Sequence, residues 1–61
     1  MRDRDLATIR RIVQGLKLES KTHFSRKDID QIIRELELNR EYTLAYGVRS
    51  MDPANLTALM R

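Results

Sequence analysis

The stretch from Phe24 to Leu36 constrains the fold of this chain more than any other, because it combines a complete helix start with an apolar stripe. Ser25 can accept a hydrogen bond from the N–H of Asp28, and the Asp28 carboxylate can accept one from the N–H of Ser25, as in a capping box. Phe24 and Ile29 occupy the two positions where apolar side chains staple the incoming chain to the first turn. The stripe recurs at i, i+3, i+4 and i+7, in Ile29, Ile32, Ile33 and Leu36. The sequence therefore predicts an amphipathic helix against which the other segments pack.

The length and composition bound the class of protein. The chain has 61 residues, which predicts one small domain over residues 1–61, either complete or a fragment of a longer chain. A domain of this size buries only about 60% of the surface that its unfolded chain exposes, so we expect a partner to add stability. With no cysteine and one histidine, neither a disulfide nor a structural metal site is expected. No apolar run approaches the roughly 20 residues that span a bilayer, and we expect a cytoplasmic protein without a membrane partner.

A first helix is predicted ahead of this central one. Asp3 or Asp5 can cap it, and apolar residues then recur at helical spacing in Leu6, Ile9, Ile12, Val13 and Leu16. Gly15 lowers the helix propensity near the end of this pattern. The helix is expected to stop between Leu18 and Ser20.

Residues 42–48 admit two interpretations. The central helix cannot continue far past Glu37, because Leu38 falls opposite the apolar stripe. A turn near Leu38 resolves this conflict, with Asn39 as the N-cap of a third helix and Gly47 near its end. The same segment also alternates as a strand would, in Tyr42, Leu44, Tyr46 and Val48. A single strand would need a partner strand from another subunit, so we favour the helix and keep the strand as the alternative.

The last segment begins with a clear helix start. Asp52 followed by Pro53 is typical of an N-cap and first helical position, and Met51 with Leu56 can form a second staple. The predicted fold is all-α: a small tri-helical domain, helix-turn-helix-like, with a short C-terminal fourth helix. The expected core consists of Leu6, Ile9, Ile12, Val13, Leu16, Phe24, Ile29, Ile32, Ile33, Leu36 and Tyr42.

Charge is distributed unevenly along the chain. The net charge is +3, but residues 1–27 carry eight Lys and Arg against three Asp and Glu, whereas the remainder is mildly acidic. This polarity predicts an anionic partner for the first half or head-to-tail self-association. An ordinary solvated surface of mixed charge would give the same composition.

The sequence offers no catalytic constellation. It lacks cysteine, its single histidine, His23, lies in a polar connection, and no motif places a base beside a serine. Its two glycines, Gly15 and Gly47, do not form a phosphate-binding loop. We therefore expect no enzyme, no cofactor, no metal site and no small-molecule substrate.

Residues Ile29–Gly47 resemble a helix-turn-helix motif. In that resemblance Leu38 is the apolar residue of the turn, and Arg40 and Thr43 stand where a recognition helix meets a major groove. Glu37 stands where such motifs commonly have glycine, and Thr43 where an inward-packing residue is expected. The resemblance implies a small DNA-binding, transcription-regulating protein whose basic first half neutralises phosphates. The predicted nucleic-acid contacts are Arg10, Arg11, Lys17, Lys21, Arg26, Lys27, Arg40 and Thr43.

The alternative is a non-catalytic helical module that binds protein as an adaptor, inhibitor or oligomerisation domain. The segment after Asn39 carries more apolar surface than one helix face can bury, and tyrosines often anchor interfaces. The predicted interface residues are Tyr42, Leu44, Tyr46, Val48, Met51, Leu59 and Met60. A homodimer would satisfy both hypotheses, and we expect either a homodimer or another protein partner besides double-stranded DNA.

Overall fold

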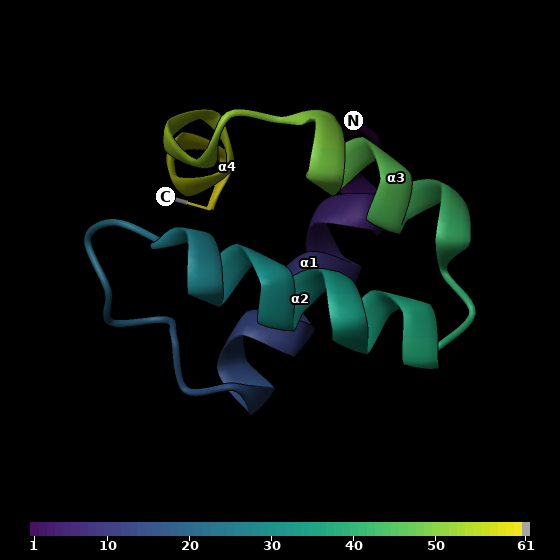
Figure 1. Ribbon diagram of the computed structural model, residues 1–61, viewed down its shortest axis with the longest axis horizontal. Coiled ribbons are helices and arrows are strands. Elements are labelled where there is room, and N and C mark those ends of the chain that lie inside the picture. The colour runs from purple at the N-terminus through teal and green to yellow at the C-terminus, as the bar shows by residue number, and fades with distance from the viewer. Residues whose placement is uncertain (61) are drawn as a thin grey trace.

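The computed structural model describes residues 1–60, and Arg61 lies outside the described residues. It contains four helices: α1 (Asp3–Gly15), α2 (Arg26–Leu38), α3 (Tyr42–Ser50) and α4 (Pro53–Leu59) (Figure 1). Residues 1–60 include no strand, which confirms the all-helical fold with a short fourth helix. The alternative of a strand over residues 42–48 is wrong, because Ala45 and Val48 share one helical face and are buried on it.

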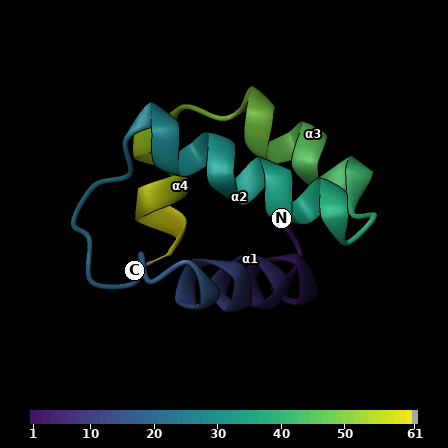
Figure 2. The same ribbon diagram turned by 60° about the horizontal axis from the view of Figure 1, so that its bottom comes forward.

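The central place of α2 is as predicted. It packs against both α1 and α3. In Figure 2, α1 lies on one side of the molecule, α2 and α3 lie on the other, and α4 closes one end between them. In both figures α3 runs back alongside α2, as the second helix of a helical hairpin does. No helix in the described part is long and apolar enough to cross a membrane.

The core lies between these helices and differs from the predicted core at a few positions. Its buried apolar residues are Ile9, Ile12, Val13, Leu18, Phe24, Ile29, Ile32, Ile33, Leu36, Ala45, Val48 and Leu56. Leu6 and Leu16 are only partly buried, and Leu18 is buried instead. The prediction that Tyr42 is a core residue is wrong, because its side chain is 62% exposed. Tyr42 opens α3, and it is Ala45 and Val48 that face the interior.

The first helix is shorter than predicted, ending at Gly15 rather than between Leu18 and Ser20. Lys17 adopts a left-handed conformation with φ 61°. Its N–H donates to the Gln14 carbonyl at 3.0 Å, and the Leu18 N–H donates to the Val13 carbonyl at 2.9 Å, which together form a Schellman motif. The predicted cap by Asp3 or Asp5 is also wrong: Arg2 is at the N-cap without a side-chain bond, and both aspartates lie in the first turn.

The second helix begins as predicted and ends where the sequence predicts a turn, near Leu38. Ser25 and Asp28 form the complete capping box. The helix continues through Leu38 and ends in a second Schellman motif, in which Arg40 has φ 59° and the Glu41 N–H donates to the Leu36 carbonyl at 2.8 Å. Arg40 therefore lies in the turn rather than on a recognition helix.

The boundaries predicted for the third helix are both wrong. Asn39 is the C-cap of α2, and the N-cap position of α3 is Glu41, whose side chain makes no capping bond. Gly47 lies inside α3, which continues to Ser50, because burial of Val48 beyond the glycine holds the last turn.

The fourth helix begins as predicted. The Asp52 carboxylate accepts a hydrogen bond from the Ala54 N–H at 3.0 Å, and Pro53 is the first helical residue. Thr57 is buried, and its hydroxyl donates to the Pro53 carbonyl at 2.9 Å while accepting from the Phe24 N–H at 3.3 Å. This bond ties α4 to the connection before α2.

Candidate binding surfaces

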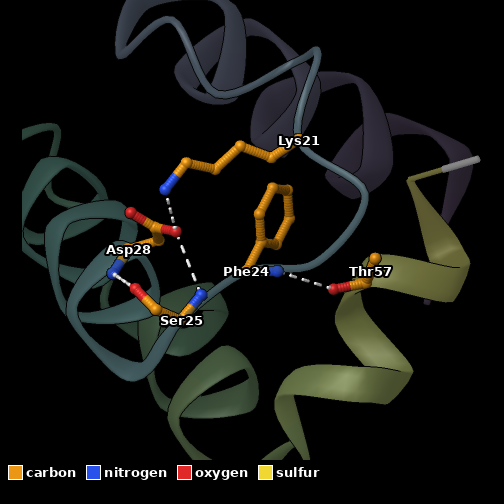
Figure 3. Close-up of polar contacts among 5 residues, drawn as sticks. All are labelled: Lys21, Phe24, Ser25, Asp28 and Thr57. Carbon is orange, nitrogen blue, oxygen red and sulfur yellow. Dashed lines mark hydrogen bonds and ion pairs between the residues drawn. The ribbon is translucent and has the colours of Figure 1, made fainter.

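A polar cluster joins the α1–α2 connection to the start of α2 (Figure 3). Lys21 Nζ lies 2.8 Å from Asp28 Oδ2, and the Ser25 N–H donates to the same oxygen at 3.0 Å. The Asp28 N–H in turn donates to Ser25 Oγ at 3.1 Å. The hydrogen bond from Lys21, followed by that from the Ser25 N–H, lowers the pKa of Asp28 below its ordinary value. Because these groups satisfy one another, the cluster is structural.

The cluster bears on the prediction that Arg26 and Lys27 bind phosphate at this helix end. A helix N-terminus attracts anions through free N–H groups and the positive end of the dipole. Here the Asp28 carboxylate already occupies that position and accepts the Ser25 N–H. Arg26 is engaged as well, with its Nε 3.5 Å from Asp30 Oδ1. Lys27 is exposed.

The predicted nucleic-acid contacts are dispersed over several surfaces. Arg10 and Lys21 line one cleft together with Glu19. Arg11 lines another cleft, beside Glu35 and Glu41. The remaining members lie elsewhere: Lys17 and Arg40 follow the ends of α1 and α2, Arg26 and Lys27 open α2, and Thr43 lies in α3. The structure thus gathers no more than two of the eight predicted contacts in any one of the described clefts.

The predicted protein-interface residues are partly brought together. Leu44, Met51 and Leu59 line one groove between the start of α1, the inner side of α3 and the end of α4. We call this the apolar groove. Its complete lining is Met1, Asp5, Glu41, Thr43, Leu44, Gly47, Met51 and Leu59, and it encloses about 490 Å³.

The other predicted interface residues lie outside the apolar groove. Tyr42 and Tyr46 are 62% and 72% exposed, but they are absent from its lining. Met60 lines the cleft that contains Arg10 and Lys21. Val48 is fully buried, so its prediction as an interface residue is wrong: it packs into the core from the inner face of α3.

Sequence reasoning missed four members of the apolar groove: Met1, Asp5, Glu41 and Gly47. Asp5 was predicted only as a possible N-cap of the first helix. Glu41 lines this groove and also the adjoining cleft that runs along α1 past Thr8 and Ile12.

The described residues also bear on metal binding. Within residues 1–60, no group of three or more His, Cys, Asp or Glu side chains is placed to hold a metal ion.

No protein-family model matches the sequence, and comparisons with curated proteins and with solved structures gave no match either.

Proposed function

We propose that this chain is a non-catalytic helical module that binds a segment of another protein in the apolar groove. The observation that carries the proposal is the gathering of Leu44, Met51 and Leu59, from α3, the α3–α4 connection and α4, around one concave surface. Concave apolar surfaces of this kind take up the apolar face of an amphipathic helix. Methionine side chains, here Met1 and Met51, adapt their shape to such a partner.

The charges of the groove specify the partner further. Its only ionisable side chains are the carboxylates of Asp5 and Glu41. The adjoining cleft adds Glu35 and one cation, Arg11. The two linings together thus carry three carboxylates and one guanidinium, on a chain with net charge +3. Charge complementarity favours an occupant that carries Lys or Arg beside its apolar residues.

Duplex DNA binding is the second candidate. The excess of cations in residues 1–27 favours it, and all eight predicted contacts are exposed. Against it, Arg10 and Arg11 line different clefts, and Lys21 and Arg26 already pair with Asp28 and Asp30. Salt-dependent binding of a random duplex would identify this function.

Fluorescence anisotropy with three labelled probes tests both candidates. The probes are a short amphipathic helix of Leu and Lys, the same helix with Glu in place of Lys, and a random DNA duplex. We expect the protein to bind the Leu/Lys helix in preference to the Leu/Glu helix. Binding of neither helix would overturn the proposal, and duplex binding alone would establish the second candidate.

A charge-reversed variant locates the site. Asp5→Lys with Glu41→Lys should weaken the Leu/Lys helix by about tenfold, the effect of losing two exposed charge pairs of up to about 1 kcal/mol each. It should also strengthen the Leu/Glu helix. Asp3→Lys with Glu19→Lys is the matched control, because it changes the net charge equally while neither residue lines the groove. Equal loss of binding in the control would place the contact elsewhere.

A further inference from the structure

One face of α2 is exposed and has a composition that fits the apolar groove. Lys27, Gln31, Arg34 and Leu38 recur at i, i+4, i+7 and i+11, so they share a face. All four are exposed, and Leu38 is 71% exposed although it is a large apolar residue. We call these four residues the α2 stripe. It lies away from the buried residues of the same helix, Ile29, Ile32, Ile33 and Leu36.

The cations of the α2 stripe are available to a partner. Among residues 1–60, neither Lys27 nor Arg34 forms an ion pair, whereas the neighbouring Arg26 pairs with Asp30. The stripe contains no acidic residue. It therefore combines one exposed leucine with two cations along about 17 Å of helix. This is the apolar and cationic surface that the acidic lining of the groove favours.

We infer that the occupant of the apolar groove is the α2 stripe of a second copy of this chain, an inference that rests on the function proposed for the groove. Leu38 of one copy enters between Leu44, Met51 and Leu59 of the next. Arg34 and Lys27 lie toward the carboxylates of Asp5 and Glu41. Each copy thus contributes a donor face and a receiving groove.

The geometry makes this contact heterologous. No residue of α2 lines the apolar groove, so the two surfaces of one copy are separate and both stay open to neighbours. A heterologous contact closes into a ring or continues as a chain of copies. Burial of apolar surface between copies also stabilises a domain that is small by itself, and it does so increasingly as the protein concentration rises.

Sedimentation equilibrium of the full chain over a wide concentration range tests the inference. The wild type is expected to rise above its monomer mass of 7.2 kDa as the concentration increases. The stripe variant, Leu38→Gln with Arg34→Glu, and the groove variant, Asp5→Lys with Glu41→Lys, should each remain monomeric. Arg4→Glu, an exposed change on α1 outside both surfaces, should associate like the wild type.

Mixing the two variants gives the decisive result. An equimolar mixture retains one intact stripe and one intact groove, so it should form a species of twice the monomer mass that grows no further. A mixture that stays monomeric, or a stripe variant that still associates, would overturn the inference. If the wild type is monomeric but binds the Leu/Lys helix, self-association fails and the groove function stands. If it does neither, both fail.

Discussion

The starts of α2 and α3 differ in what holds them. At α2, Ser25 and Asp28 form a complete capping box, and the buried Phe24 precedes it. At α3, Glu41 makes no capping bond, and the preceding Arg40 is held at φ 59°, where a side chain is strained. The first start is stabilised by local contacts between neighbours in sequence. The second is stabilised by packing, since Ala45 and Val48 are buried against the rest of the core.

A helix start can therefore be stabilised in either of two ways, and substitutions near the start have opposite effects on stability in the two cases. Where local bonds hold the start, a substitution can only remove them. Where packing holds the start, local substitutions can improve it, and only a core change damages it. Four measurements of stability test this contrast.

The largest effect is expected from the core residue that holds α3. Val48→Ala removes two methyl groups from a fully buried side chain and should destabilise the protein by about 2 kcal/mol. Urea denaturation followed by circular dichroism measures the change. Tyr46→Ala, on the exposed side of the same helix, is the control and should change stability by no more than about 0.5 kcal/mol. Equal losses in the two variants would show that α3 is not held by packing on its inner face.

The capping box should contribute less. Ser25→Ala removes the acceptor of the Asp28 N–H and should cost about 1 kcal/mol, which corresponds to roughly 4–8 °C in the melting temperature of so small a domain. Glu41→Ala, at the equivalent position of α3, removes no capping bond and should leave the melting temperature nearly unchanged. If the Glu41 variant lost as much as the Ser25 variant, the contrast between the two starts would be refuted.

A glycine before α3 should stabilise the protein. Arg40→Gly relieves the strain of a left-handed side-chain residue, partly offset by the greater freedom of glycine in the unfolded chain, for a net gain of about 0.5–1 kcal/mol. Arg40→Ala keeps the Cβ and should give no such gain. Lys17→Gly, at the end of α1, should repeat the gain, because Lys17 has the same conformation with φ 61°. A destabilised Arg40→Gly variant would contradict this assignment.

The smallest effect is the pH dependence that the start of α2 confers. The pKa of Asp28 is lowered from its ordinary value of 3.8 by the hydrogen bonds from Lys21 and from the Ser25 N–H. A lowered pKa in the folded state means that the stabilisation is fully present above the unfolded value and is lost as the pH falls through the folded value. Denaturation across acidic pH should therefore show a decline that Asp28→Asn reduces. An unchanged decline in that variant would assign it to other carboxylates.

The correctly predicted helix starts share a physical basis. The capping bonds at Ser25 and Asp52 join residues within three positions of one another, so the sequence contains all the interacting groups. The buried face of α2, formed by Ile29, Ile32, Ile33 and Leu36, was likewise predictable from its spacing. The all-helical fold follows from these signals.

The missed boundaries share a different basis. The Schellman motif at the end of α1 uses Lys17 where glycine is the usual signal, so no residue type marks the end of this helix. Gly47, in contrast, suggested a helix end and lies within α3. In each case the buried neighbours Leu18 and Val48 outweigh the local preference.

The candidate site was predictable only in part. Leu44, Met51 and Leu59 were predicted interface residues and do meet in one groove. The tyrosines of α3 fall outside that groove, and Val48 is in the core. Which apolar residues of α3 face the interior depends on the rotation of the helix against α2, and no local signal determines that rotation.

The positions of the helices and the turn after Leu38 follow from the sequence, because capping bonds and apolar spacing act between residues a few positions apart. The end of α1, the buried side of α3 and the meeting of Asp5, Glu41 and Leu59 in one groove depend on the tertiary structure. These outcomes depend on contacts between distant segments, whose burial contributes more free energy than the local preferences they override.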